Sequence, residues 1–432
     1  SRNPFSIDPL FQDYKDKEKC ENDEKLFVAT KEAKDAVVCL GLGKRVVCWG
    51  EIGVGKTTLL NMLLYLAHFR DNCLPIRVII KEDNVDRAIQ ELLYTYCFDL
   101  ISELKEKRVT EPMKSARKWL LEKRYADKLY DFMCKLIGAY EEEKVKETKI
   151  SAAAGVSVGL EAGLETEAVT VSSFKTYVEN LPVKMIEERL REIQELVQKL
   201  GYKGTVFALD EADHIPDVNK VLSMLTVSRE LFFASKNFTF IVAGSPEMIE
   251  QDRKREITGI FDAHIYLRKL KADDLKVALS RRIQAEKETL SLADVFETEA
   301  IELIIKNSGG ILKLAMKLAE NSLDQAAVSP ERKVQPLHVN AAIARVRTDI
   351  QFDLSETELR VLKALHKLGK ASPSDKTFQK EAELSRPKLN IVVRELNRKK
   401  IVGFSRKGRK IFYTLNSVYL PIISEIIETR SA

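Results

Sequence analysis

The sequence of 432 residues lacks several features that would assign it to a class of protein at once. It has no uncharged apolar run of about 18 residues, which a membrane-spanning helix requires, and no apolar signal-peptide segment near its start. Its six cysteines form no C-x-x-C pair and all precede residue 135, so we expect reduced thiols rather than a disulfide framework. The five histidines are scattered and predict no metal site. These absences argue against a secreted, disulfide-stapled or membrane-embedded protein.

Charge is unevenly distributed along the chain. With 45% hydrophobic and 31% charged residues, the chain can bury real cores, and its length predicts about three domains at roughly 150 residues each. Residues 352–432 hold 17 basic and 9 acidic residues, a net charge of +8. The remaining 351 residues hold 53 basic and 56 acidic ones, a net charge of −3. A mildly acidic body with a basic end predicts that nucleic acid binds at that end.

The strongest motif is Gly50-Glu51-Ile52-Gly53-Val54-Gly55-Lys56-Thr57-Thr58, which fits G-x-x-x-x-G-K-[ST]. An apolar strand, 45–49, precedes it, and an apolar helix starting near Leu59 follows it. In such a loop, backbone N–H groups and the helix N-terminus surround phosphate. Lys56 is expected to reach the β- and γ-phosphates, and the Thr57 hydroxyl to hold Mg²⁺. The cofactors predicted are therefore ATP and Mg²⁺.

A second acidic motif follows the apolar strand 205–209. Asp210 is expected to reach the Mg²⁺ end of the phosphate loop, and Glu211 to polarise the attacking water. An acidic pair after a strand is usually a solvated loop, but the upstream phosphate loop favours the catalytic interpretation. The letters Asp-Glu-Ala-Asp also spell a helicase motif, although no second set of helicase motifs is present.

Together these segments resemble the AAA+ ATPases. A third apolar strand, 239–243, precedes Ser245, which matches the family's sensor 1 position between the two Walker strands. Arg253 and Arg255 stand just before the last core strand, where family members carry the arginine finger that enters a neighbouring subunit, although a solvated basic turn is the alternative. The resemblance also implies a helical lid over 270–351, in which Lys313 stands where the family usually has a sensor 2 arginine. The residues expected to bind ATP are Gly50, Gly53, Val54, Gly55, Lys56, Thr57, Thr58 and Lys313.

A large insertion separates the two Walker motifs, because a βαβ unit needs only about 30 residues. Residues 85–148 and 181–200 have helical periodicity, and 150–171 has the small, alternating residues of a β-hairpin. The hairpin has no Lys or Arg between Ile150 and Lys175, so we expect it to face protein rather than DNA. A flap with no partner is the alternative.

The basic end resembles a winged helix-turn-helix. A capping box at 355–358 opens the first helix, a second covers about 376–384, a third runs from Ser385 to Lys400, and two strands flank a basic turn. The third helix is expected to enter the major groove, and the turn to contact phosphates or the minor groove. A protein-docking role for this module is the alternative. The residues expected to bind DNA are Arg386, Lys388, Asn390, Arg394, Arg406, Lys407, Arg409 and Lys410.

The order of segments resembles the origin-recognition initiators of archaea and eukaryotes, while residues 51–54 look more like those of transposition-regulator ATPases. We therefore expect an α/β P-loop AAA+ core with a parallel sheet, a helical and β-hairpin insertion, a helical lid and a C-terminal winged helix. The expected units are 1–84 and 204–269 for the core, 85–203 for the insertion, 270–351 for the lid and 352–432 for the winged helix.

Three functions follow from this resemblance. The first is a slow, switch-like ATPase that binds double-stranded DNA and assembles with its own subunits in replication initiation or loading. The second is an ATPase of a mobile element, plasmid or defence system that recruits a partner through the insertion. The third is a signalling or scaffold ATPase whose winged helix binds protein. We expect a cytoplasmic, DNA-associated protein with no membrane contact.

Overall fold

A parallel sheet forms the centre of the computed structural model. Its five strands are β1 (Val46–Gly50), β2 (Leu74–Ile79), β3 (Thr205–Asp210), β4 (Phe238–Gly244) and β5 (Ala263–Leu267), in the spatial order β2-β3-β4-β1-β5. All neighbouring pairs are parallel. The structure describes residues 5, 8–51, 53–80, 92, 95–96, 99–100, 183–212, 215, 218–232, 238–244, 248–249, 259–330, 333–352, 354–399, 401–407, 410–416, 420 and 423.

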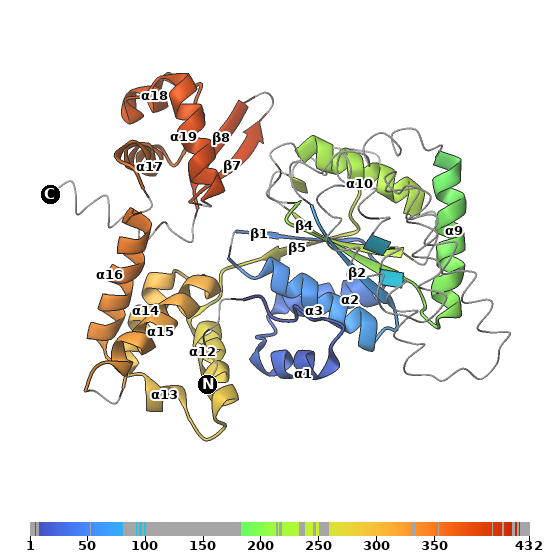
Figure 1. Cartoon of the computed structure of the whole chain (residues 1–432), viewed down its shortest axis with the longest axis horizontal. Coiled ribbons are helices and arrows are strands. Elements are labelled where there is room, and N and C mark those ends of the chain that lie inside the picture. The colour runs from blue at the N-terminus through green and yellow to red at the C-terminus, as the bar shows by residue number, and fades with distance from the viewer. Residues whose placement is uncertain are drawn as a thin grey trace, which may run out of the picture.

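Helices cover both faces of the sheet, as the continuously apolar strands require. On one face, α2 (Lys31–Gly41) packs against β1 and β5, and α3 (Lys56–Phe69) packs against β1, β2, β3 and β4. Helix α1 (Lys17–Leu26) lies beyond them. On the other face lie α9 (Val183–Lys199) and α10 (Val218–Phe232) (Figure 1). The sheet is therefore buried between two helical layers.

The ends of the predicted insertion pack into the core. Leu190, Ile193, Leu196 and Val197 of α9 are buried in the same cluster as Phe207 of β3. The helix predicted over 181–200 is thus confirmed as α9. Leu92 and Leu100, from the predicted helical segment 85–148, belong to this cluster as well. The predicted hairpin over 150–171 lies outside the described residues.

A helical lid follows β5. It consists of α12 (Ala272–Glu286), α13 (Leu292–Val295), α14 (Thr298–Ser308), α15 (Leu312–Ala327) and α16 (Pro336–Phe352). These helices lie where the lid is predicted, over 270–351, and α16 ends one residue later at Phe352. Within the described residues, no helix is both long enough and apolar enough to cross a bilayer.

The N-terminal segment contacts both the lid and the core. Phe5 is fully buried in the lid cluster, where its ring meets that of Phe296 edge to face. Phe11 is also fully buried, but among residues of the core, with Tyr65 of α3 and Phe27 around it. Phe5 and Phe11 are therefore anchored in the lid and in the core, respectively.

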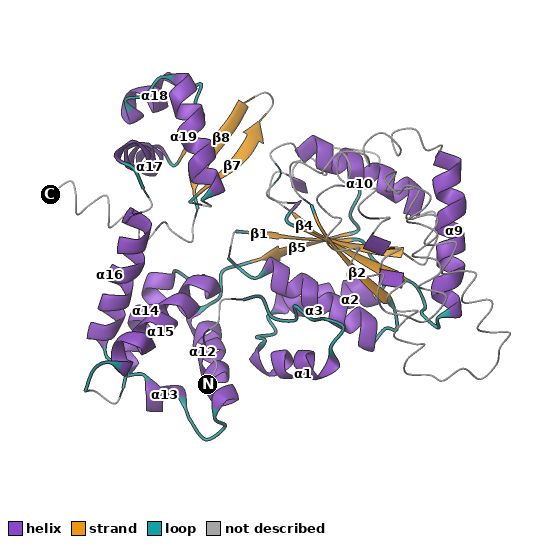
Figure 2. Ribbon diagram, in the orientation of Figure 1, coloured by secondary structure: helices purple, strands orange, loops and turns teal. Residues whose placement is uncertain are grey.

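The C-terminal unit lies beyond α16 (Figure 2). It comprises α17 (Glu356–Leu368), β6 (Lys370–Ala371), α18 (Lys376–Ala382), α19 (Arg386–Arg398), β7 (Val402–Lys407) and β8 (Lys410–Leu415), with an antiparallel sheet in the order β6-β8-β7. The Ser355–Glu358 capping box opens α17 as predicted. The order of helices and hairpin also follows the prediction.

Candidate functional site

The phosphate loop connects the end of β1 to the start of α3. Gly50 passes so close to β5 that a Cβ there would lie 2.5 Å from the backbone oxygen of Leu267. Gly55, the N-cap of α3, has φ 101°, which only glycine adopts without strain. A Cβ on Gly55 would meet nothing within 4 Å, so open space lies in front of the helix N-terminus. That space is suited to an anion, because the first N–H groups of α3 have no intrahelical partners.

Lys56 is the first residue of α3 and is only 8% exposed. Its Nζ donates to the backbone oxygens of Gly50 at 2.8 Å and Glu51 at 3.1 Å. The lysine therefore curls over its own loop and brings a positive charge to the open space before the helix. Glu51 in turn forms a 3.1 Å ion pair with Lys269, just after β5.

Asp210 lies at the end of β3, beside the phosphate loop. It is 2% exposed, and its Oδ1 accepts a hydrogen bond from Thr57 Oγ1 at 3.3 Å. Oδ1 also accepts from the backbone N–H of Glu211 at 2.9 Å. The two predicted Mg²⁺ ligands, far apart in sequence, are thus in contact.

A hydroxyl and a carboxylate side by side are oxygen donors of the kind that Mg²⁺ prefers, and such sites are completed by phosphate oxygens and water. The residues present therefore fit the ion. No group of three or more His, Cys, Asp or Glu side chains able to hold a metal occurs in the described part of the chain.

Glu211 is half-buried and has φ 61°, a left-handed conformation that is strained for a residue with a side chain. Strained backbone of this kind persists where the surrounding structure holds it, often at functional sites. Glu211 lines the same cavity as Lys56 and Thr57. Its position is therefore compatible with the predicted role, which stays a prediction.

A cavity of about 300 Å³ lies between the core, the lid and the N-terminal segment. Gly53, Val54 and Thr58 of the phosphate loop line it, together with the exposed Lys313 of α15. Its apolar lining, which is suited to a nucleotide base, comprises Pro9, Leu10, Leu26, Phe27, Val28, Ala278, Leu312 and Met316. Three parts of the chain thus enclose one site.

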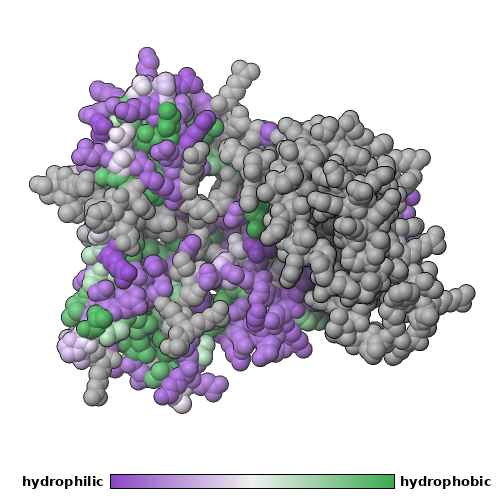
Figure 3. Space-filling model, in the orientation of Figure 1, coloured by the Kyte–Doolittle hydropathy of each residue, from purple (hydrophilic) through white to green (hydrophobic). Residues whose placement is uncertain are grey.

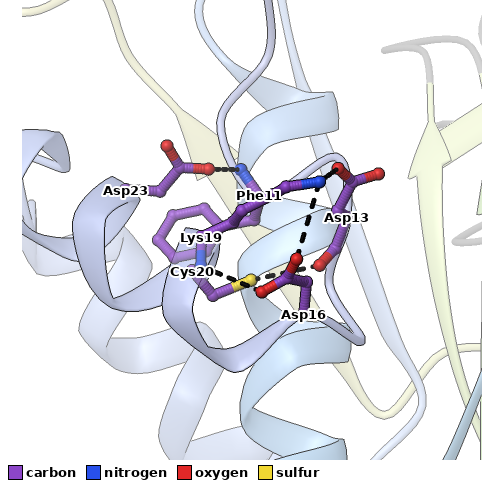
Figure 4. A network of polar contacts seen from close by, with 6 residues as sticks. All are labelled: Phe11, Asp13, Asp16, Lys19, Cys20 and Asp23. Atoms are coloured by element: carbon purple, nitrogen blue, oxygen red, sulfur yellow. Dashed lines mark hydrogen bonds and ion pairs between the residues drawn. The ribbon is translucent and has the colours of Figure 1, made fainter.

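A network of polar contacts holds the N-terminal wall of this cavity (Figure 4). Asp23 of α1 accepts a 2.6 Å hydrogen bond from the backbone N–H of Phe11, directly after the cavity residues Asp8, Pro9 and Leu10. Lys19 Nζ donates to Asp13 at 2.7 Å, and the Cys20 thiol donates to the Asp13 backbone oxygen. Burial raises the pKa of this thiol to about 12, so it remains protonated and keeps donating.

Two arginines at the site were not predicted from the sequence. Arg282 of α12 lines the cavity at 7% exposure, and its Nε donates to the Met316 sulfur at 3.1 Å. Burial lowers the pKa of this guanidinium, and the charge of Asp23 opposes the shift only in part. Arg77 of β2 forms an ion pair with Asp210. No local sequence motif marks Arg282 or Arg77 as a site residue. Only the positions of α12 and β2 relative to the phosphate loop and β3 could have indicated them.

Some predicted site residues fall outside the description. Ser245, Arg253 and Arg255 lie outside the described residues. The strand that precedes Ser245 is nevertheless β4, which lies between β1 and β3 as the sensor 1 prediction requires.

In the C-terminal unit, Arg386, Lys388 and Arg394 of α19 are exposed and Asn390 is half-buried. The opposite face of α19 is buried through Leu389, Val392, Val393 and Leu396. Lys410 is exposed and lies 3.5 Å from Asp375. Arg406 and Lys407 fall within β7, although their side chains are not described, and Arg409 lies outside the described residues.

The strand order and the phosphate loop can now be compared with known structures. A Walker-type ATPase of Pyrococcus abyssi is similar at 13% identity with a TM-score of 0.50, over 98% of this chain and 99% of that chain. The core has the AAA+ fold.

Two further solved structures are similar to this chain with lower TM-scores. The ORC2 protein of Aeropyrum pernix, in ADPNP–ADP complexes, is 14% identical with a TM-score of 0.43, over 94% of this chain and 95% of that chain. The ORC1 protein of the same organism, in complex with DNA, is 15% identical with a TM-score of 0.42, over 93% of each chain. No model of a protein family matches the sequence, and no curated protein does. The likeness to the Pyrococcus abyssi ATPase supports the predicted P-loop core with its parallel sheet as a fold.

Proposed function

We propose that this protein binds ATP with Mg²⁺ and hydrolyses it slowly. The observation that carries the proposal is the meeting of Lys56, Thr57 and Asp210 at one cavity beside the N-terminus of α3. Lys56 would bind the β- and γ-phosphates, and Thr57 and Asp210 would hold the ion, which would neutralise phosphate charge. Glu211 would orient and polarise the attacking water. Gly50, Gly53, Val54, Gly55 and Thr58 would enclose the phosphates through their backbone.

Three further groups complete the proposed ATP site. Ser245 would act as sensor 1, and Arg253 or Arg255 would enter the site of a neighbouring subunit. Lys313 would approach the γ-phosphate from the lid, because it lines the cavity and is exposed. Lysine keeps the charge of the usual arginine but offers a single nitrogen instead of a planar fork. Assembly of subunits would then depend on bound ATP.

We also propose that residues 352–432 form a winged helix that binds double-stranded DNA. The exposed face of α19 presents Arg386 and Arg394 two turns apart, where both can point into one groove. Hydrophilic residues occupy much of the visible surface of this unit (Figure 3), and the segment carries a net charge of +8. Arg406, Lys407, Arg409 and Lys410 would contact the DNA backbone from the β7–β8 turn. Lys388 and Asn390 would join the helix in base contacts.

The process that best accounts for an ATP-switched DNA-binding protein is replication initiation or a related loading step, in the cytoplasm at the DNA. A mobile-element, plasmid or defence ATPase that recruits a protein through 85–203 is the second candidate, favoured by the phosphate-loop residues 51–54. A scaffold ATPase with a protein-binding C-terminal unit is the third.

The deciding experiment is fluorescence anisotropy of labelled duplex DNA across a salt series, with ADP, an ATP analogue or no nucleotide. The test variant carries alanine at Arg386, Arg394, Arg406 and Arg409. Its matched control removes four exposed lysines elsewhere, by alanine at Lys34, Lys44, Lys287 and Lys306.

We expect affinity that rises with the ATP analogue and falls steeply with salt, because phosphate contacts release counterions. The test variant should lose binding and flatten the salt slope, and the control should do neither. Sequence-specific footprints would favour the initiator role, and ATP-dependent filaments on arbitrary DNA the mobile-element role. Absence of DNA binding in every nucleotide state would reject DNA binding and leave the scaffold role.

A further inference from the structure

The carboxylate proposed to serve Mg²⁺ is also bound by an arginine from the neighbouring strand. Arg77 Nη2 donates to Asp210 Oδ2 at 2.7 Å. Arg77 lies on β2, which runs parallel to β3 so that Ile79 is opposite Asp210. The Asp210 side chain is 3% exposed and that of Arg77 is 22% exposed. The pair therefore lies at the buried edge of the site, on the β2 side.

The two carboxylate oxygens of Asp210 have different partners. Oδ1 accepts from the Thr57 hydroxyl and from the Glu211 backbone N–H, at 3.3 Å and 2.9 Å. Oδ2 accepts from Arg77. One oxygen thus faces the phosphate loop, and the other faces away from it toward β2.

Arg77 binds in a way that leaves Oδ1 available. Arginine commonly grips a carboxylate through two parallel hydrogen bonds, which would occupy both oxygens. Here one nitrogen binds one oxygen, and the buried Nε of Arg77 has no hydrogen-bond partner within the described part of the chain.

The charge balance at Asp210 has a further effect. A buried carboxylate with no counterion is strongly disfavoured, and an adjacent guanidinium compensates for the lost hydration. The Arg77 guanidinium therefore supports Asp210 in its buried position beside Thr57.

We propose that Arg77 is a positioning residue for the metal carboxylate. By binding Oδ2 it fixes the rotamer of Asp210 with Oδ1 beside Thr57, where that oxygen can serve the ion. The inference rests on the proposed function, in which Thr57 and Asp210 serve Mg²⁺.

The test measures the affinity of the full chain for a fluorescent ADP analogue, by titration at several free Mg²⁺ concentrations and in excess chelator. The variants are Arg77→Met, which removes the charge, Arg77→Lys, which retains it, Asp210→Asn, and the Arg77→Met/Asp210→Asn double variant. Arg70→Met is the matched control. Arg70 forms a 2.7 Å ion pair with Asp71, and neither residue lines the cavity.

We expect Arg77→Met to raise the Mg²⁺ concentration needed for tight nucleotide binding by about 10-fold or more, the usual effect of losing a residue that orients a metal ligand. Affinity in chelator should stay unchanged, which also reports that the variant is folded. Arg77→Lys should restore most of the Mg²⁺ response. In the Asp210→Asn background, Arg77→Met should add nothing, since Arg77 acts through that carboxylate. Arg70→Met should match the parent protein.

Three results would overturn this inference. The first is an unchanged Mg²⁺ response in Arg77→Met. The second is a stronger Mg²⁺ response in that variant, which would make Arg77 a competitor of the ion. The third is a further loss of Mg²⁺ response when Arg77→Met is added to Asp210→Asn. If Arg77→Met fails to fold, Arg77→Lys decides. A lost Mg²⁺ response in Arg77→Lys would overturn the inference, and a retained response would support it. A parent protein indifferent to Mg²⁺, or an Asp210→Asn variant equal to it, would instead reject the proposed function.

Discussion

The rings of Phe5 and Phe296 meet edge to face with their centroids 5.9 Å apart, and so fasten the start of the chain to the lid. A few residues later, Phe11 stacks on Tyr65 of the core at 5.7 Å. The residues between these two anchors, Asp8 to Leu10, line the nucleotide cavity. The lid, the cavity wall and the core are therefore linked by one short segment.

Phe5→Ala should destabilise the protein and weaken nucleotide binding together. Loss of a fully buried phenylalanine costs about 3–5 kcal/mol, and the cavity wall loses its attachment to the lid. Urea unfolding and titration with a fluorescent nucleotide measure the two effects. Leu337→Ala, at a 54% exposed position of the lid, is the control and should change neither. An intact affinity in Phe5→Ala would show that the wall holds without its anchor.

Lys56→Ala should abolish nucleotide binding, because the variant removes the cation that faces the phosphates while leaving the loop glycines in place. Titration with a fluorescent ATP analogue measures the loss. Lys44→Ala, at an exposed position just before β1, should bind like the parent protein. Comparable affinities in both variants would contradict the assignment of the site.

Glu211→Gln should bind ATP normally but hydrolyse it about 100-fold or more slowly, since the amide does not polarise water while Asp210 still holds the ion. Phosphate release under single-turnover conditions gives the rate. The variant should also accumulate in the ATP-assembled form, which sedimentation detects. Glu299→Gln, exposed on α14, should hydrolyse at the parent rate; normal hydrolysis in Glu211→Gln would move the catalytic role elsewhere.

Gly50→Ala should displace the phosphate loop, because the new methyl group would lie 2.5 Å from the Leu267 backbone oxygen, which cannot move away independently. Overpacking of this kind costs about 1–3 kcal/mol, and nucleotide affinity should fall with it. Thermal unfolding and nucleotide titration report both. Gly403→Ala is the control, since a Cβ there meets nothing within 4 Å.

Stability of the C-terminal unit should decline in acid through Glu358. Burial would raise the pKa of this carboxyl, but Lys399, 2.8 Å away, and the Ser355 cap outweigh burial and hold the pKa below its ordinary 4.5. The charged form therefore contributes stability that is fully present above pH 4.5 and is lost as the pH falls through the lower folded pKa.

Lys399→Met should move the acid unfolding midpoint to higher pH, as followed by circular dichroism from neutral pH downward. Lys367→Met removes the more exposed pair with Glu381 and should shift it much less. Equal shifts in the two variants would mean that the Glu358 pair has no special weight.

The sequence was sufficient to predict the parts of the site that have local signals. Gly50 to Thr58 is a contiguous motif, Asp210 ends an apolar strand, and Ser355 with Glu358 forms a capping box. The structure confirms the helices and the strand that these signals predict, namely α3, β3 and α17. Arg77, Phe5 and Arg282 have no such signal. Their partners Asp210, Phe296 and Met316 are distant in sequence, and only strand pairing and helix packing bring them together.

The position of β1 in the sheet has a consequence for synthesis of the chain. Residues 46–50 pair only with β4, from residue 238 onward, and with β5, from residue 263 onward. Contacts so distant along the chain form slowly and leave apolar strands unpaired in the interim. A nascent chain therefore carries its complete phosphate motif long before it has a sheet to hold it. We expect the chain to bind nucleotide only after β5 has left the ribosome, and until then the unpaired apolar β1 is prone to association with other chains.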